Sequence, residues 1–401
     1  MPLQPHLLTT EEVAMRLGVK PTTVYAYVSR GMLPSIRNAG GKGSLFAKSD
    51  IDAFVARRTR PTTPAISTGI TLIKDGALYY RGQDATLLAR TASFESVATL
   101  LWTGEREHVD LVPSKELKTL AAATIVPLPR SGRITDRLRV IVAAAAAADP
   151  LRFDTSPAAV LTTARTMLAT MVAALPYSQG VTTAEVLRRE QGTIPLAELL
   201  WPRLTLRDPT PARQETLNAA MILLADHDIA ASTLAARVAA STRAHPYAVV
   251  SAGLAALDGP YHGAASGLAY ALLKDAMDAD PVTTIAARLR DEGLIPGFGH
   301  PLYPDGDPRA TTLMAMLDDG PVRDTAVQVA EAMLDRSGTH PNIDFALAAL
   351  TLQNDMPADA GEAIFAVART AGWLAHALEE YADRPSRFRP VGQYSGRNPG
   401  A

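Results

Sequence analysis

The sequence predicts a mainly α-helical protein in which a small N-terminal domain precedes a large helical body. Two observations carry this prediction: apolar residues recur at helical spacing through most of the chain, while strand-like alternation is almost absent. A Pro- and Thr-rich segment at 59–69 lacks this spacing, so a linker and a domain boundary are expected there. The 401 residues suffice for two or three domains with a large buried core.

The composition is that of an ordinary globular protein, with 47% hydrophobic and 20% charged residues. Because the chain has no cysteine, disulfides, thiolate nucleophiles and Cys-ligated zinc are excluded, and any catalysis must use His, Asp, Glu, Ser or Arg. No apolar run is long enough to cross a bilayer, and the first residues lack the pattern of a secretory signal. The sequence therefore predicts a cytoplasmic protein without membrane contact.

Charge is distributed unevenly along the chain. Residues 1–60 contain nine Lys and Arg against four acidic residues, a net charge of +5, and since the whole chain carries -2, the remainder carries -7. A basic N-terminal domain on an acidic body suggests that the domain meets an anionic partner.

Two short helices are expected to open the N-terminal domain. The first begins around 7–12, where Thr9 and Glu12 have the spacing of a capping box. Pro21 suits the first position of the second helix, which ends near Ser29. This spacing of two helices is typical of a helix-turn-helix.

Two strands at 33–37 and 45–46 are expected to flank a glycine-rich wing at 40–44, before another helix begins near Lys48. The order of helices, strands and wing resembles the winged helix-turn-helix domains of the MerR and excisionase type. The likeness covers residues 7–58.

This resemblance implies that the N-terminal domain, assigned to residues 1–58, binds DNA with its second helix in the major groove. Four basic side chains are placed to reach phosphates: Lys20, Arg30, Arg37 and Lys42. The alternative is a structural or dimer-stabilising appendage without a nucleic-acid partner, and the sequence leaves both readings open.

The body begins with a small hairpin at 70–80 that turns at Asp75 and Gly76. Nearly everything beyond it is predicted to be helical, with clear apolar stripes in 156–175, 213–225 and 229–240. The body is assigned to the rest of the chain as one all-α unit.

Three short blocks rich in Gly and Pro, at 259–263, 297–310 and 342–345, carry side chains suited to chemistry. They supply two imidazoles, a guanidinium and a carboxylate: His262, His300, Arg309 and Asp344. Removing a proton next to a carbonyl and stabilising the resulting enol requires such groups. No His or carboxylate cluster has metal-ligand spacing, and no phosphate-binding glycine motif occurs, so neither a metal nor ATP or NAD is expected.

Asp344 has two interpretations. It lies between Ile343 and Phe345, where an apolar setting would raise the pKa of its carboxyl and make it a stronger base. Alternatively, it simply caps the N-terminus of the helix that follows.

The three blocks, in this order, resemble the citrate synthase family, and the likeness extends over nearly all of 70–401. It implies a large and a small helical domain, the small one at about 270–365, in a homodimer. It also implies condensation of acetyl-CoA with oxaloacetate, or a related 2-oxo acid, through an enol intermediate. Hydrolysis of the citryl-CoA thioester to citrate and CoA would follow, with acetyl-CoA as a substrate and no cofactor required.

The resemblance also assigns roles. Asp344 would take the proton from the acyl-CoA methyl group, His262 would stabilise the enol oxygen, and His300 would protonate the ketone oxygen of the acceptor. Guanidinium groups bind carboxylates bidentately, so arginines suit a dicarboxylate acceptor. The acceptor contacts implied are His227, Arg309, Arg369 and Arg389, the last reaching across the dimer interface.

Two alternatives stay open. The chain departs from the family pattern at Ala230, at Ser266 and Gly267, and at Pro301, which puts the acceptor and the donor in doubt and admits a 2-methylcitrate synthase that uses propionyl-CoA. The second alternative is a DNA-binding transcriptional regulator that uses the body as a metabolite sensor. The retained acid, base and guanidinium groups favour an enzyme, since a sensor can lose its base and still bind.

Overall fold

The computed structural model describes residues 7–17, 19–29, 33–37, 43–48, 50–51, 54, 66–178, 194–292 and 294–389. The chain divides into two compact units, Met1–Ser67 and Thr68–Ala401. Each unit has a hydrophobic core of its own.

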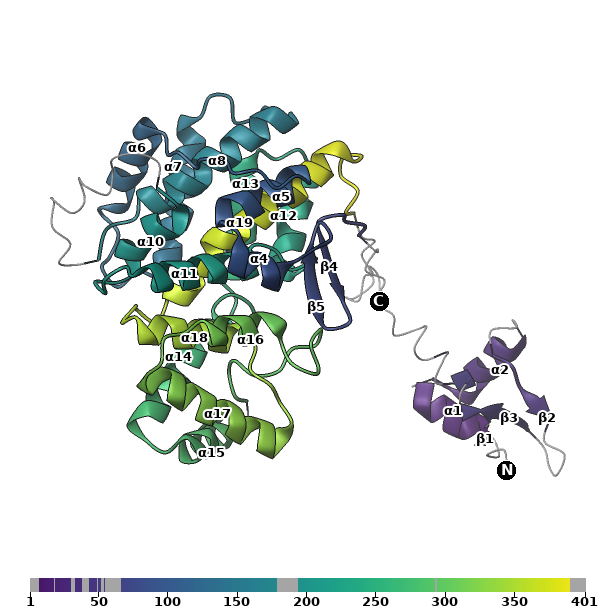
Figure 1. Cartoon of the computed structure of the whole chain (residues 1–401). Helices are drawn as coiled ribbons and strands as arrows, with labels where there is room; N and C mark the ends of the chain where they lie inside the picture. Colours follow the sequence, from purple (N-terminus) through teal and green to yellow (C-terminus); the bar gives the residue numbers. More distant parts are fainter. Residues whose placement is uncertain are drawn as a thin grey trace. The chain divides into compact units, whose positions relative to one another are not determined.

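Within its described residues, the N-terminal unit contains two complete helices and a three-stranded antiparallel sheet (Figure 1). The helices are α1 (Thr10–Leu17) and α2 (Pro21–Ser29), and the strands, in sheet order, are β1 (Leu7–Thr9), β3 (Ser44–Ala47) and β2 (Ile36–Arg37). Its core contains Val13, Val24, Leu33, Phe46 and Ile51. Of the helix expected to begin near Lys48, residues 48, 50, 51 and 54 are described, and all four are helical.

The predicted capping box is confirmed: the Thr9 N–H donates to Glu12 Oε2 at 2.8 Å, and the Glu12 N–H donates to Thr9 Oγ1 at 3.3 Å. The prediction that the helix opens at residue 7 was wrong. Residues 7 to 9 form β1 instead, because pairing with β3, Leu8 opposite Phe46, satisfies their backbone groups in the sheet. The strand expected at 33–37 is shorter, since Leu33 is buried in the core before β2 begins. Most of the wing at 40–44 lies outside the described residues.

The hairpin predicted at the start of the body is confirmed as β4 (Thr71–Lys74) and β5 (Ala77–Tyr80), and a short third strand, β6 (Gln83–Asp84), extends it. The turn residues Asp75 and Gly76 both have positive φ angles, 52° and 74°, as the tightest hairpin turns require. Tyr80 at the end of β5 is fully buried, and its hydroxyl donates to the carbonyl of Asp226 at 3.0 Å.

The remaining helices form a larger and a smaller group (Figure 1). The larger group contains α4 (Ala85–Thr91), α5 (Phe94–Thr103), α6 (Lys115–Ile125), α7 (Ile134–Ala148), α8 (Pro157–Ala173), α10 (Leu196–Leu204), α11 (Pro211–Leu224), α12 (Ala231–Ser241), α13 (Pro246–Leu257) and α19 (Ala360–Ala382). The predicted helical stripes at 156–175, 213–225 and 229–240 correspond to α8, α11 and α12.

Helix α19 forms the centre of the larger group and is buried on all sides from Ala360 to Ala377. It approaches the backbone before α12 so closely that only glycine fits at position 372. A Cβ there would lie 2.4 Å from the carbonyl oxygen of Ala225, and the Gly372 N–H donates to that oxygen at 3.1 Å. This contact fixes the segment that precedes His227.

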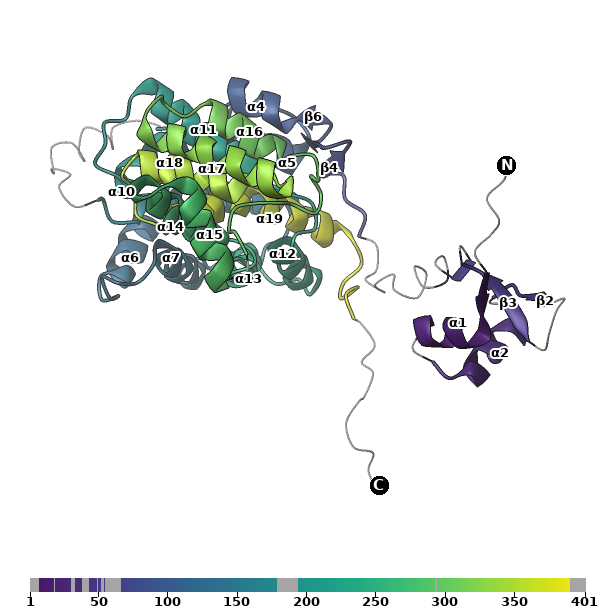
Figure 2. The same ribbon diagram turned by 90° about the horizontal axis from the view of Figure 1, so that it is seen from below.

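The smaller group contains α14 (Ala265–Asp278), α15 (Pro281–Glu292), α16 (Pro308–Ala315), α17 (Pro321–Ser337) and α18 (Ile343–Gln353). Figure 1 shows these helices together below the larger group, with α16 and α18 next to it, and Figure 2, seen from below, shows them in front of it. The blocks 259–263, 297–310 and 342–345 all lie where the two groups meet.

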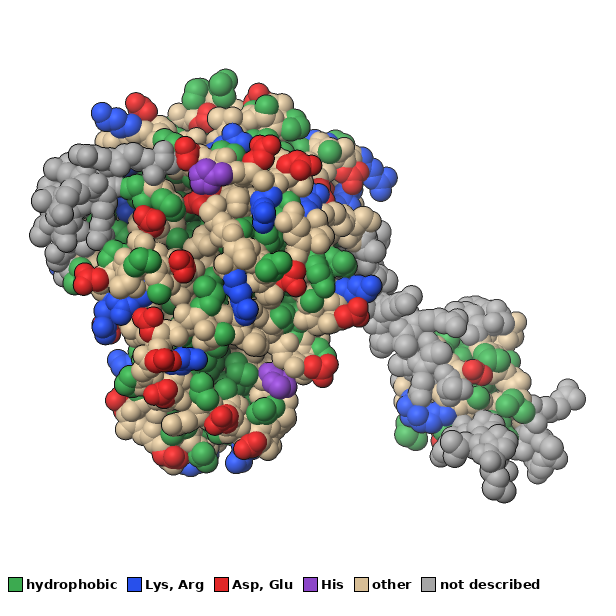
Figure 3. All heavy atoms as spheres, in the orientation of Figure 1, with side chains coloured by type: hydrophobic (Ala, Val, Ile, Leu, Met, Phe, Trp, Pro, Cys, Tyr) green, Lys and Arg blue, Asp and Glu red, His purple; other side chains and the backbone are tan. Residues whose placement is uncertain are grey.

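None of the helices within the described residues is long and apolar enough to cross a membrane. On the face of the body seen in Figure 3, acidic and basic side chains are interspersed. The described residues of that face therefore offer no continuous basic surface of the kind that nucleic acids bind.

Candidate active site

One pocket of the body brings together most of the residues predicted to do chemistry. Its lining includes His227, His262, His300, Arg309, Asp344 and Arg369. The pocket has a volume of about 580 Å³, and residues of both helix groups line it. Segments more than 100 residues apart in the sequence therefore converge on it.

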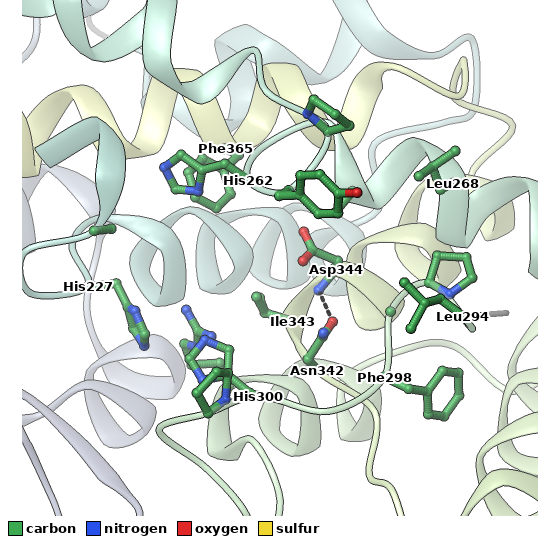
Figure 4. Close-up of a pocket in the computed structure, with 18 of the residues that line it drawn as sticks. His227, His262, Leu268, Leu294, Phe298, His300, Asn342, Ile343, Asp344 and Phe365 are labelled. Carbon is green, nitrogen blue, oxygen red and sulfur yellow. Dashed lines mark hydrogen bonds between the residues drawn. The ribbon is translucent and has the colours of Figure 1, made fainter. Parts of the chain in front are cut away.

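The two ends of the pocket differ chemically. In the view of Figure 4 the imidazoles of His227, His262 and His300 lie toward one end, the side chains of Leu268, Leu294 and Phe298 lie toward the other, and Asp344 lies between them. The pocket thus has a polar end suited to a charged molecule and an apolar end suited to a longer molecule with apolar groups.

Backbone hydrogen bonds place the block at 297–310 against the block at 342–345. The Asn342 N–H donates to the carbonyl of Gly297 at 2.9 Å, and the side-chain amide of Asn342 donates to the carbonyl of Gly299 at 3.0 Å. Gly297 has a φ of 85°, and a Cβ at this position would lie 2.9 Å from the Cβ of Phe345. Only glycine lets the loop that carries His300 approach α18 this closely.

Asp344 does not cap its helix. The N-cap of α18 is Asn342, whose side-chain oxygen accepts the Asp344 N–H at 3.0 Å, so the capping interpretation of Asp344 was wrong (Figure 4). The Asp344 Oδ1 atom is buried and has no hydrogen-bond partner among the described residues. Burial raises the pKa of this carboxyl to about 7, against the opposing effect of Arg309. The carboxylate is therefore unusually basic, and one of its oxygens has no hydrogen-bond partner among the described residues.

His262 lies in the turn between α13 and α14, with its Nε2 atom 2.7 Å from Ser232 Oγ and its ring edge-on to Phe365. Burial lowers the pKa of His262 to about 4, so the ring is neutral at pH 7. The indole N–H of Trp373 donates to Ser232 Oγ at 3.3 Å. If the serine hydroxyl in turn donates to Nε2, the indole N–H, the hydroxyl and Nε2 are all paired, and the His262 proton resides on Nδ1.

His300 is held in the other tautomer by its own loop. The Leu302 N–H donates to His300 Nδ1 at 3.2 Å, so the proton of the neutral ring resides on Nε2. Burial, reinforced by the nearby guanidinium of Arg309, lowers the pKa of His300. His300 therefore offers an N–H donor at physiological pH.

His227 is 7% exposed, and its Nε2 atom lies 2.9 Å from the hydroxyl of Tyr303. The rings of His227 and His300 meet edge to face, with 5.2 Å between their centres. Burial, followed by the charges of Arg309 and Arg369, lowers the pKa of His227 well below its usual value. The polar end of the pocket thus holds neutral imidazoles beside two cations.

The two arginines of the pocket differ in how they are paired. Arg309 is 2% exposed and forms a two-pronged ion pair with Asp307, Nε to Oδ1 at 3.0 Å and Nη2 to Oδ2 at 2.8 Å. Arg369 is 1% exposed and donates from Nε to the carbonyl of Leu224 at 2.7 Å, but its Nη1 atom is buried without a partner among the described residues. Burial lowers the pKa of Arg369 to about 10. A bound carboxylate would satisfy this guanidinium.

The structure does not bring Arg389 to the pocket. Arg389 is exposed at the end of the described residues, beyond α19, and the part it was predicted to play across a dimer interface stays a prediction. In the N-terminal unit, Lys20 is exposed before α2 and Arg37 lies on β2, whereas Arg30 and Lys42 lie outside the described residues.

Sequence reasoning missed two polar residues of the site, Asp307 and Tyr303. Asp307 caps α16 and also accepts the Ile343 N–H at 3.1 Å, so it ties two of the blocks together. Tyr303 orients His227. Both belong to the block that contains His300 and Arg309, and the Asp-Pro-Arg spacing of a capped helix start could have drawn attention to Asp307.

Comparison with known proteins agrees with this geometry. A sequence profile described as "Citrate synthase, C-terminal domain" matches residues 61–391. The chain belongs to the citrate synthase family. It is an enzyme of the citrate synthase type, a class that takes acetyl-CoA as a substrate and needs no cofactor.

Individual citrate synthase relatives cover most of the chain. The citrate synthase of Haloferax volcanii is 31% identical over 80% of this chain and 90% of its own length. The 2-methylcitrate synthase 2 of Corynebacterium glutamicum is 28% identical over 80% of this chain and 89% of its own length. The crystal structure of citrate synthase from Thermotoga maritima superimposes with a TM-score of 0.64 at 26% identity, over 84% of this chain and 94% of that one. A helix-turn-helix domain profile matches residues 7–59, ahead of the citrate synthase body.

Proposed function

We propose that this citrate synthase family member condenses acetyl-CoA with oxaloacetate, or a closely related 2-oxo dicarboxylate, and releases citrate and CoA. The observation that carries the proposal is the state of Asp344. Its carboxyl has an unpartnered, buried oxygen and a pKa of about 7, and it lies between the apolar and polar ends of the pocket. A base in this position can reach a donor held at one end and deliver the resulting carbon nucleophile to an acceptor held at the other.

Enol formation is the first step. Asp344 removes a proton from the methyl carbon of the acetyl thioester, and the electron pair of that C–H bond moves into the new carbon-carbon double bond. The thioester oxygen gains charge, and the Nδ1–H of His262 donates a hydrogen bond to it. Because His262 is neutral and held by Ser232, the donor is oriented before the reaction begins.

Condensation is the second step. The enol carbon attacks the ketone carbon of the acceptor, and the ketone oxygen takes the proton that His300 offers from Nε2. Arg309 and Arg369 bind the carboxylates of the acceptor, and His227 contributes a further polar contact. Attack of water on the citryl-CoA thioester then yields citrate and the CoA thiol.

A homodimer whose pocket closes between the two helix groups is part of this proposal. Lining by both groups supports the closure, since their approach would exclude water from the reactive enol. The homodimer follows from the family resemblance alone. Arg389 would complete the acceptor site of the partner copy. The cytoplasmic location stays a prediction.

Two further functions have specific support. The likeness to the 2-methylcitrate synthase 2 of Corynebacterium glutamicum supports use of propionyl-CoA as an alternative donor. The helix-turn-helix match at 7–59 supports DNA binding by the N-terminal unit, either beside catalysis or in place of it if the body acts as a sensor.

A steady-state assay of CoA release tests the enzyme proposal. The purified full chain is offered acetyl-CoA or propionyl-CoA with oxaloacetate, 2-oxoglutarate or pyruvate. We expect release that depends on both substrates and is fastest with a 2-oxo dicarboxylate. If no pair releases CoA above the rate without enzyme, the body is a sensor rather than a catalyst.

A further inference from the structure

A buried charged network lies beside the pocket without lining it. It consists of Asp226, which precedes α12, Arg237 on α12, and His376, Glu379 and Glu380 on α19. Asp226, Arg237, His376 and Glu380 are each at most 1% exposed. Buried ion pairs of this kind contribute little net stability, because desolvation offsets their attraction. A role in positioning is therefore the more informative explanation.

The network fixes the tautomer of His376. Arg237 Nη1 lies 2.5 Å from His376 Nδ1, and since a guanidinium can only donate, Nδ1 must accept. The proton of His376 therefore resides on Nε2, which lies 3.3 Å from Asp226 Oδ2 and donates to it. The same Asp226 oxygen accepts the hydroxyl of Thr71 on β4 at 2.5 Å. His376 thus accepts a hydrogen bond from Arg237 and donates one to Asp226.

One end of the network holds the first residues of the body. Glu379 Oε1 accepts the Gly69 N–H at 2.9 Å and the Thr68 hydroxyl at 3.3 Å, while Glu379 Oε2 accepts from Arg237 Nη1 at 2.7 Å. Thr68 and Gly69 are the last two residues of the predicted linker. The point at which the N-terminal segment joins the body is therefore bonded to the network.

The other end of the network adjoins the residues of the pocket that are proposed to bind the 2-oxo acid. Asp226 is followed directly by His227, and Tyr80 of the hairpin donates to the Asp226 carbonyl. Two residues earlier, the carbonyl of Leu224 accepts from Arg369 Nε at 2.7 Å. Any displacement of Asp226 would therefore move His227 and the backbone that orients Arg369.

We propose that the network is a positioning device that sets the affinity of the pocket for the 2-oxo acid, and that its anchor is the N-terminal segment at Thr68 and Gly69. The proposal rests on the proposed function, in which His227 and Arg369 contact the acceptor. His376 and Glu379 are positioning residues, since neither reaches the pocket. A change in how the segment is held would alter acceptor affinity without altering the donor end.

The test compares His376→Leu with His376→Gln in the full chain. Leucine removes both hydrogen bonds, whereas the glutamine amide offers an acceptor and a donor and should rescue. We expect His376→Leu to raise the KM for oxaloacetate roughly tenfold or more, the scale of a small displacement of binding groups, with kcat and the KM for acetyl-CoA within about twofold. Glu379→Ala should act in the same direction by releasing Gly69. The control is Asp275→Asn, which breaks an exposed ion pair with Arg288 between α14 and α15 and should change neither KM.

Calorimetric titration of each full-chain variant with oxaloacetate alone separates this proposal from the proposed function. If the wild type binds oxaloacetate but releases no CoA, the catalytic proposal fails, and weaker binding by His376→Leu still supports the network. Unchanged oxaloacetate affinity in both His376→Leu and Glu379→Ala overturns the network. A loss that His376→Gln fails to rescue, or a wild type that does not bind oxaloacetate, overturns it as well.

Discussion

The side-chain oxygen of Asn342 accepts the backbone N–H of Asp344 at 3.0 Å, so an amide and not the carboxylate caps helix α18. A carboxylate that capped the helix would be stabilised in its charged form and would be a weak base. With the cap supplied by its neighbour, the Asp344 carboxyl keeps an unpartnered oxygen inside the pocket. The local helix start thus explains how a strong base is available where the two ends of the pocket meet.

Replacing Asp344 with alanine tests its role as the base. We expect kcat for CoA release to fall at least about 100-fold, the scale of a lost general base, while oxaloacetate still binds. Steady-state kinetics give the first quantity and calorimetric titration gives the second. A variant with near wild-type turnover would remove Asp344 from the mechanism.

The pH dependence of catalysis should report the same carboxyl. Because the base acts only when ionised and its pKa is about 7, kcat/KM for acetyl-CoA should fall about tenfold per pH unit below 7 and level off above it. The imidazoles do not cause this fall in kcat/KM at low pH, since burial lowers the pKa of His262 to about 4. A profile that is flat from pH 5.5 to 8 would contradict the assignment.

Stability should depend on pH in a related way. The carboxyl of Asp344 has a higher pKa in the folded chain than in the unfolded chain, so the folded state binds more protons between about pH 4 and 7 and loses stability as pH rises through this range. Asp344→Asn, which stays neutral, should therefore be more stable than the wild type at pH 8, by about 2–4 kcal/mol, and equal to it near pH 4. Denaturant unfolding at both pH values measures the difference. Equal stability at pH 8 would show that the charged carboxylate carries no folding cost.

The three blocks could be predicted from the sequence because each is short and punctuated by Gly and Pro, with its reactive side chain at a fixed offset from the turn. The raised pKa of the Asp344 carboxyl was also predicted, although its apolar neighbours in the sequence are only part of the cause. Phe345 packs into the core next to Gly297, and it is burial where the two helix groups meet that raises the pKa of Asp344.

Contacts between elements could not be predicted in this way. Ser232 orients His262 only because α12 stands beside a turn 30 residues later. Nothing near His376 in the sequence reveals its partners Arg237 and Asp226. Strand β1 was missed for a similar reason, since its partner β3 lies more than 30 residues away.

Ser232→Ala should disturb the donor end of the site. Without the hydroxyl, His262 loses the partner of its Nε2 atom and the preference for the Nδ1–H tautomer, so kcat should fall about 10- to 100-fold, as when a supporting hydrogen bond to a functional imidazole is lost. The matched control is Ser251→Ala on α13, whose hydroxyl donates to the Tyr247 carbonyl away from the pocket. Equal kcat in the two variants would mean that Ser232 does not orient His262.

The N-terminal unit gives the last prediction. If α2 enters the major groove, Lys20, which is exposed directly before α2, lies where it can neutralise a phosphate. Lys20→Ala should then weaken DNA binding by the full chain and reduce the slope of log affinity against log salt by about one, because one fewer counterion is released. Lys274→Ala, at an exposed position of α14 in the body, is the matched control and should leave both quantities unchanged. Fluorescence anisotropy on genomic fragments that flank the chain's own gene, from about 50 to 200 mM salt, measures both quantities.

The N-terminal unit has few side chains able to read bases, so tight DNA binding should require two copies joined through the body. If the wild type binds no fragment even at the lowest salt, the helix-turn-helix is an appendage of an enzyme and the regulator hypothesis fails with it.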